Sequence, residues 1–578
     1  MTFSGIGQYV DPLIRPLAKF AFDDISGESI KIGNRGKEAV ISLLRTQHAD
    51  KTMCVLCPKQ SDARILFNDL HDYFGATANL VFLPDADVLP YERLVVDSRT
   101  TNERITTLSK LAKKSEHVVV VSSIGAALRK TLNPNTFENA SIGLVNIISG
   151  QELTSIQTFL NQLIDMGYKS VSIVEAPGTF SNRGGIIDVY PPNHPYPIRI
   201  DLWDTEIESL RYFDVNSQRS VEEINSGIVL TLASEQLRSL IDMNQLSPKV
   251  RNLDYSECTS DISDRIKQEL ETLQEIADPE SFEFFNGFFN DSTLFDYLSR
   301  DSLLVFDRKQ LVIEEEAVIQ EKIEGITSSR CERGDLPRNF PSPIARLDEI
   351  DIGSHVIDLD AYGIEENDHL FTSPRQYAGN LDQFISDITS NKTANINLIV
   401  TRQSYLRLKS LLESQSVTNY HSLEGVENYS LQPGQCYLLE ADLSAGWDIR
   451  INSSTNLQVF TDLEMFGVSR TTGNWQSANE KRHTGYKSLQ DLTVGSYVVH
   501  IDHGISQFTG LTTMGAFSDK EYLVLEYAQE DKLYVPTDQL HRVSPFVGSS
   551  DQAPSLTRLG TSEWSRLKEK VKESAQEL

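Results

Sequence analysis

The chain has few cysteines and no long apolar run. Its cysteines number five, an odd count scattered over 578 residues, which is typical of a reducing compartment and argues against a disulfide framework. No apolar stretch approaches the roughly twenty residues that span a bilayer, and no charged and apolar leader opens the chain. We therefore expect a cytoplasmic protein with no membrane partner.

Positive charge is also scarce. Lys and Arg number 53 against 82 Asp and Glu, so the formal net charge is −29. A broad grip on duplex DNA needs clustered cations against phosphates, and this composition argues against one while leaving room for local basic patches. Because single cores stop growing at about 250 to 300 residues, we expect roughly three to five domains.

An intact phosphate-binding loop is missing as well. Such a loop reads G-x-x-x-x-G-K-[ST], and the nearest string is GNRGKE, from Gly33 to Glu38. It lacks two loop residues, and Glu38 replaces the magnesium-binding hydroxyl with a charge that repels phosphate. Asp348 and Glu349 resemble the Asp-Glu pair of a motor, but no apolar strand precedes them, which favours an exposed loop. We expect no cofactor and no catalytic residue in this chain.

Two further pairs lack the partners that metal binding needs. Cys54 and Cys57 form C-x-x-C on a strand with no second pair to complete a zinc site, so buried structural cysteines are expected. His500 and His503 in HIDHG have no Cys or carboxylate at ligand spacing. Gly504 after them would supply the positive φ of a turn. We expect no metal site.

The order of apolar segments predicts an α/β protein. From Lys51 the chain reads as strand, helix, strand, helix and strand, with the last strand a continuous apolar run, which indicates a buried parallel sheet of Rossmann-like or RecA-like type. The stretch 232–350 contains acidic helices and the strand SLLVFD, interpreted as the return of this domain. INLIVTR, CYLLEADL and NLQVFTDLEMFG predict a second small parallel sheet over 351–468.

The most informative stretch runs from Gly178 to Ser220. A glycine pair follows Arg183, an alternating strand covers 186–190, and a proline-bounded loop leads to a second strand with Arg199 and Trp203. This order predicts a twisted antiparallel sheet. Residues two apart share a face, so the charged residues and Trp203 point one way and the isoleucines the other. One face is apolar, and the other is free to bind.

The last part of the chain predicts a small all-β domain. Runs such as SYVVH, EYLVLEY and KLYVP alternate with Gly and Asp, which is typical of a strongly bent antiparallel sheet or barrel. A polar stretch over 469–487 reads as a linker before it. After it, SEWSRLKEKVKESAQEL predicts a helix with Ser562 as its N-cap.

Two of these stretches carry a family resemblance. Residues 178–220 resemble the UvrA-binding domain shared by UvrB and by the transcription-repair coupling factors (Mfd). Residues 488–546 resemble the RNA-polymerase-interacting domain of those factors, which is also found in CarD-type regulators. The implied fold is α/β multidomain: a UvrB-like, degenerate RecA/Rossmann-like domain with an inserted α+β UvrA-binding domain, a second small α/β domain, and a small all-β CarD/Tudor-like domain.

The resemblance implies the following order: the UvrB-like domain, first part, 1–145; the UvrA-binding domain, 146–231; the UvrB-like domain, second part, 232–350; the small α/β domain, 351–468; a linker, 469–487; the RNA-polymerase-interacting domain, 488–550; and the start of a relay helix to a missing motor, 551–578.

The resemblance also implies contact residues for UvrA. These are Arg183, Arg199 and Trp203. From the residues taken singly, both arginines would be solvated strand residues and Trp203 a half-buried core residue.

For the RNA polymerase β subunit the implied contacts are Leu511, Thr513 and Met514, through pairing of exposed edge strands. Met514 could instead fill an irregular gap in the core of its own domain.

The implied role is an adaptor in transcription-coupled nucleotide excision repair. The chain would bind RNA polymerase stalled at a DNA lesion and recruit UvrA, while a missing C-terminal motor would bind ATP, Mg²⁺ and most of the DNA. Two alternatives remain: a UvrB-type damage-loading ATPase, which needs an intact phosphate loop and a long aromatic hairpin where this chain has LVVDSRTTNERI, and a CarD-type transcription regulator.

Overall fold

The computed structural model describes most residues between 5 and 557. The residues it leaves out in that range are 23–28, 33–34, 76–78, 87–89, 93–96, 114–116, 139–143, 216, 236, 238–242, 273–282, 354, 361–369, 391–394, 415–416, 418, 424–425, 427–428, 453–454, 468–494, 501–502, 514–520, 529–530, 537–542 and 546–555. The chain forms two compact units, 1–469 and 470–578, which are described separately. Within the described residues, no helix has the length and apolarity needed to cross a membrane.

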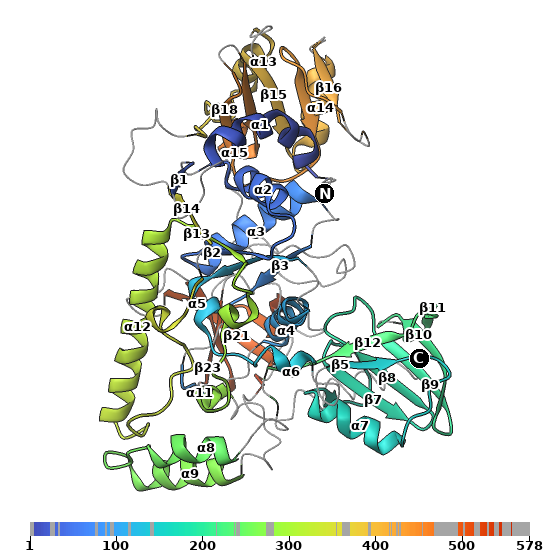
Figure 1. Cartoon of the computed structure of the whole chain (residues 1–578), viewed down its shortest axis with the longest axis vertical. Helices are drawn as coiled ribbons and strands as arrows, with labels where there is room; N and C mark the ends of the chain where they lie inside the picture. The colour runs from blue at the N-terminus through green and yellow to red at the C-terminus, as the bar shows by residue number, and fades with distance from the viewer. Residues whose placement is uncertain are drawn as a thin grey trace. The chain divides into compact units, whose positions relative to one another are not determined.

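A parallel six-stranded sheet with the order β1-β14-β13-β2-β4-β3 organises the first unit (Figure 1). The strands are β1 (Ser29–Lys31), β2 (Met53–Cys57), β3 (Leu80–Leu83), β4 (Val119–Ser123), β13 (Leu303–Asp307) and β14 (Val356–Asp360). The helices of this part are α1 (Gly7–Phe22), α2 (Lys37–Gln47), α3 (Gln60–Phe74), α4 (Ser98–Ala112), α5 (Ile124–Leu128), α6 (Asn135–Glu138) and α12 (Lys309–Glu332). Every residue of β2, β4 and β13 is buried, as expected for a sheet covered on both faces.

This sheet confirms the strand-helix-strand-helix-strand prediction and the return of SLLVFD, which is β13. The range 351–468, however, does not stay together. Its first strand, β14, pairs with β13 and β1 in the first sheet. The alternation of residues in VIDLD fits a strand but carries no information about which sheet the strand joins. Its sheet is set by the pairing with β1 and β13, which are distant in sequence.

The stretch between α6 and α8 forms an inserted module. β5 (Leu144–Ile147) pairs with β12 (Ile228–Thr231), and helix α7 covers Ile156–Asp165. The Ser155 hydroxyl accepts from the backbone N–H of Thr158 at its start, and Gly167, with φ of 88°, follows its end as predicted. The module's sheet has the order β11-β10-β9-β8-β7-β6, with bounds Lys169–Ser170 (β6), Thr179–Arg183 (β7), Ile186–Tyr190 (β8), Ile198–Trp203 (β9), Glu206–Phe213 (β10) and Ser220–Glu223 (β11).

Short helices and a second sheet complete the first unit. The helices are α8 (Met243–Arg251), α9 (Ser260–Thr272), α11 (Asn286–Phe289), α13 (Leu381–Ser390), α14 (Tyr405–Ser414) and α15 (Asp462–Phe466), with 3-10 turns η2 (Leu294–Tyr297) and η3 (Leu347–Glu349). The second sheet has the order β16-β17-β15-β19-β18, with bounds Asn395–Val400 (β15), Tyr420–Ser422 (β16), Cys436–Leu439 (β17), Trp447–Arg450 (β18) and Asn456–Phe460 (β19). It is parallel, as predicted, except at β18, which is antiparallel to β19.

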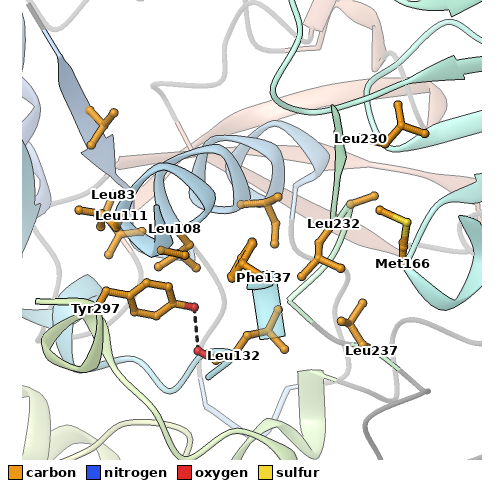
Figure 2. Packing of buried hydrophobic residues seen from close by; sticks show 14 of the residues in the cluster. Leu83, Leu108, Leu111, Leu132, Phe137, Met166, Leu230, Leu232, Leu237 and Tyr297 are labelled. Carbon is orange, nitrogen blue, oxygen red and sulfur yellow. Dashed lines mark hydrogen bonds between the residues drawn. The ribbon is translucent and has the colours of Figure 1, made fainter. Parts of the chain in front are cut away.

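Two shared cores join the parts of the first unit. One runs from the first sheet into the second sheet and includes Val55, Leu398 and Trp447. The other joins α4 to the inserted module, and Figure 2 shows Leu108 and Met166 among its labelled residues. Buried apolar residues therefore connect these parts of the unit.

The second unit contains an antiparallel sheet with the order β23-β22-β21-β20-β24. Its strands are β20 (Tyr497–His500), β21 (Gly504–Thr513), β22 (Glu521–Glu526), β23 (Lys532–Pro536) and β24 (Val543–Pro545). The predicted small antiparallel sheet is confirmed, and Gly504 has the expected positive φ, 87°. The predicted linker at 469–487 and the predicted helix after Ser562 lie outside the described residues.

Candidate protein-docking site

Two hairpins of the inserted module bring the predicted contact residues onto one face. The β7–β8 hairpin turns through Gly184, with φ of 64°, so that Arg183 lies opposite Ile186. Strand β9 then pairs with β8, which places Arg199 opposite Asp188. Because opposite residues in a sheet share a side, these side chains all lie on the outer face.

The inner face of the same strands is apolar and buried. Ile198, Ile200 and Leu202 alternate with the outer residues of β9 and belong to the core that Phe159 of α7 also joins. The predicted division of the sheet into an apolar and a polar face is confirmed. The arginines lie on the opposite, polar face of the sheet.

Asp188 links the two predicted arginines. It is 1% exposed, and its Oδ1 accepts from Arg199 Nε at 2.7 Å while its Oδ2 accepts from Arg199 Nη2 at 2.9 Å. The same Oδ2 accepts from Arg183 Nη2 at 2.9 Å. Both arginines thus already have an internal acidic partner, which the sequence did not indicate.

The two arginines differ in their hydrogen bonding and in the exposure of their side chains. Arg199 also donates from Nη1 to the Gln218 carbonyl at 3.1 Å, its guanidinium lies 4.7 Å from the Phe213 ring centroid, and its side chain is only 17% exposed. Hydrogen bonding to Asp188 raises the pKa of Arg199 above its ordinary value, so it is fully charged. The Arg183 side chain is 48% exposed and bonds through one nitrogen.

Trp203 ends β9 at the tip of the β9–β10 hairpin and is 76% exposed. Asp204 after it adopts φ of 57°, a conformation that Asp tolerates in tight turns. Ile186 is an exposed apolar residue of β8 and lies opposite Asp201, two residues before Trp203. The indole and Ile186 are therefore diagonal neighbours on one face.

Sequence reasoning missed three members of this face: Ile186, Asp188 and Arg211. Arg211 of β10 pairs with Arg199 in register and binds the Asp201 carboxylate. The signal was present in part, because Ile186 and Asp188 are two residues apart on a strand and so share a face. The cross-strand partners could not be read without the register.

The residues predicted for polymerase binding are only partly described. Leu511 and Thr513 lie in β21, where they pair with Leu523 and Glu521 of β22. Met514 lies outside the described residues. Strands β23 and β24 form the edges of this sheet.

In the described part of the GNRGKE string, Gly36, Lys37 and Glu38 each contact other protein groups. Lys37 Nζ lies 2.7 Å from the buried Asp307 carboxylate. A Cβ on Gly36 would meet the Phe371 ring at 2.4 Å. Glu38 is buried, which raises its pKa, and it accepts from Trp447 Nε1 at 2.6 Å. Strand β18 of the second sheet thus contacts the start of α2.

The predicted burial of the two cysteines is confirmed. Cys54 and Cys57 are fully buried in β2, and burial raises the pKa of both thiols well above its ordinary value. The rings of His500 and His503 lie 4.8 Å apart, but no group of three or more potential metal ligands occurs among the described residues.

Asp348 and Glu349 are exposed in the single turn η3, consistent with the predicted exposed loop.

Comparisons with known families match both predicted docking domains. Residues 145–234 match the UvrB interaction domain, and residues 492–547 match the CarD-like/TRCF RID domain. The two matched stretches lie in different compact units.

Curated relatives extend the match over most of the chain. The transcription-repair-coupling factor of Staphylococcus haemolyticus (strain JCSC1435) is 27% identical over 600 residues, which cover 96% of this chain and 48% of the relative. The factor of Staphylococcus aureus (strain MRSA252) is 27% identical over 534 residues, covering 86% and 43%. The predicted resemblance to transcription-repair coupling factors is confirmed, and the chain spans about half the length of these relatives.

Proposed function

We propose that this chain is an adaptor in transcription-coupled nucleotide excision repair, which binds UvrA through its inserted module and the RNA polymerase β subunit through its C-terminal sheet. The observation that carries the proposal is the outer face of the UvrB interaction domain, where an exposed tryptophan lies beside an exposed isoleucine and a partly exposed arginine. Tryptophan and arginine are the residues most enriched at binding hot spots.

The proposed mode of binding follows from the exposure of these groups. Trp203 and Ile186 supply apolar area at the face, and Arg183 supplies guanidinium N–H groups for a carboxylate of UvrA. Exposed charges steer association and are screened by salt, so binding should weaken as ionic strength rises.

An ATPase role is less well supported. Lys37, which a phosphate loop would use to hold a nucleotide, is paired with Asp307, and Phe371 closes the approach to Gly36. We therefore assign ATP, Mg²⁺ and the DNA translocation that the resemblance implies to a motor outside these 578 residues.

A calorimetric titration of the purified chain with UvrA at two salt concentrations tests the proposal. We expect tight, salt-sensitive binding that Arg183→Ala weakens. Arg251→Ala is the matched control, because Arg251 is an exposed cation of α8, outside the inserted module. A folded chain that bound polymerase but no UvrA would favour the CarD-type regulator instead.

Polymerase binding has its own test. Met514→Arg should abolish co-migration of the chain with the β subunit, since a charge cannot replace an apolar anchor. Retained binding by this variant would contradict the anchor role of Met514.

A further inference from the structure

We propose that Asp188 is the positioning residue of this docking face. Its carboxylate fixes the Arg199 side chain within the module and orients the guanidinium of Arg183 toward an acidic group of the partner. The inference rests on the proposed function, because UvrA is the partner that it invokes.

The first step is the place of Asp188 in the sheet. β8 lies between β7 and β9, and Asp188 is opposite Ser181 on one side and Arg199 on the other. At 1% exposure a carboxylate without partners would be costly, and hydrogen bonds from two guanidinium groups offset that cost. Asp188 therefore gathers both arginines from neighbouring strands.

The second step is the asymmetry between those arginines. Arg199 donates from Nε, Nη1 and Nη2 to protein acceptors, so each of its nitrogens is already engaged. Arg183 donates from Nη2 alone among the described contacts, and a guanidinium carries five N–H donors. Arg183 is thus bound to Asp188 through Nη2, and its guanidinium retains N–H donors for a carboxylate of the partner.

The third step is that positioning and simple competition predict opposite signs. If Asp188 only competed with the partner's carboxylate, Asp188→Asn would add a net positive charge to the face and tighten binding. If Asp188 positions the guanidinium groups, the same change removes the charge-assisted bonds that order them, and binding weakens.

A double-mutant cycle measured by titration with UvrA decides between them, using the wild-type chain, Asp188→Asn, Arg183→Ala and the double variant. We expect Asp188→Asn to weaken binding about tenfold in the wild-type background and less than about twofold when Arg183 is already absent. A purely structural role would give the same loss in both backgrounds and would overturn the inference. Tighter binding by Asp188→Asn would also overturn it.

The two proposals fail in different ways. A folded wild-type chain that binds no UvrA overturns the proposed function and this inference with it. Wild-type binding with an uncoupled or tighter Asp188→Asn variant overturns the inference alone.

A second variant leaves the buried carboxylate in place, in case Asp188→Asn does not fold. Arg183→Lys keeps the charge but loses the planar fork, so we expect a loss of about tenfold, close to that of Arg183→Ala. Arg219→Lys, at an exposed arginine of the same module, should leave the affinity unchanged. Wild-type affinity in Arg183→Lys would show that only charge matters and would overturn the inference.

Discussion

Trp203 and Leu406 are exposed to nearly the same degree, 76% and 78%, yet they have different surroundings. Single apolar residues on a surface are ordinary, and Leu406 on α14 is one of them. Trp203 lies diagonal to Ile186 on a face that also carries Arg183. A partner would therefore gain from Trp203 and not from Leu406.

Trp203→Ala should weaken UvrA binding by about 2 kcal/mol or more, roughly thirtyfold, because a hot-spot aromatic loses most of its contact area. Its exposure in the free chain means that the midpoint of thermal unfolding should barely change. Titration and a melting curve check this, with Leu406→Ala as the matched control. A Trp203→Ala variant with wild-type affinity would remove Trp203 from the face.

Asp11 of α1 predicts a pH effect on the stability of the first unit. Burial raises its pKa from 3.8 to about 6, although Ser42 and Tyr73 both donate to the carboxylate. The folded state then binds the proton more tightly than the unfolded state, so this group's contribution to the free energy of unfolding falls as pH rises from 3.8 through about 6.

Asp11→Asn should therefore be more stable than the wild type at neutral pH, by up to about 3 kcal/mol, and the difference should shrink as the pH falls toward about 4. Urea unfolding at several pH values measures both curves. A difference that stayed constant with pH would show that Asp11 does not titrate in this window.

At the scale of elements, the hydrogen bond between Glu38 of α2 and Trp447 of β18 shows how the end of the GNRGKE string is used in the fold. Glu38 alone was enough to predict that the string is unsuited to phosphate. Its partner Trp447 is 409 residues away, so no local pattern could indicate the hydrogen bond that replaces the ligand. The place of β14 in the first sheet was not predicted for the same reason, since its pairing with β13 spans a long separation in sequence.

The docking face was also only partly predictable from the sequence, although its strands are close in sequence. The alternation along β9 correctly separated outer from inner residues, because a strand has a period of two. The Asp188 contacts needed the register between β8 and β9, which periodicity does not contain.

Trp447→Phe should destabilise the first unit by about 2 kcal/mol or more, because it leaves a buried Glu38 oxygen without its donor and removes packed volume. Glu38→Leu in the same chain should recover part of the loss, since removing both polar partners costs less than removing one. Urea unfolding followed by circular dichroism measures the cycle. Strictly additive losses would mean that the two residues do not interact.

At the scale of the whole molecule, the UvrB interaction domain and the CarD-like domain belong to different compact units. The adaptor role therefore predicts that the two binding activities can be separated. The polar stretch 469–487 contains Arg470, Lys481 and Arg482, which are targets for trypsin.

Limited trypsin digestion should cut in this stretch and release an N-terminal piece that keeps UvrA binding. The C-terminal piece should keep polymerase binding. Mass spectrometry of the fragments and a pull-down with each partner check the outcome. Loss of UvrA binding on cleavage, with the N-terminal piece still folded, would show that the second unit contributes to that site.

The pairing of β1 with β14 also orders events during synthesis. Ser29 meets Asp358 in the sheet, and β13 lies between β14 and β2, so the first sheet cannot be completed until the ribosome has passed residue 360. The hairpins β7 to β10 pair only with near neighbours in sequence and can form earlier, since local contacts are made fastest. The docking face of the nascent chain should therefore fold before the six-stranded first sheet is complete.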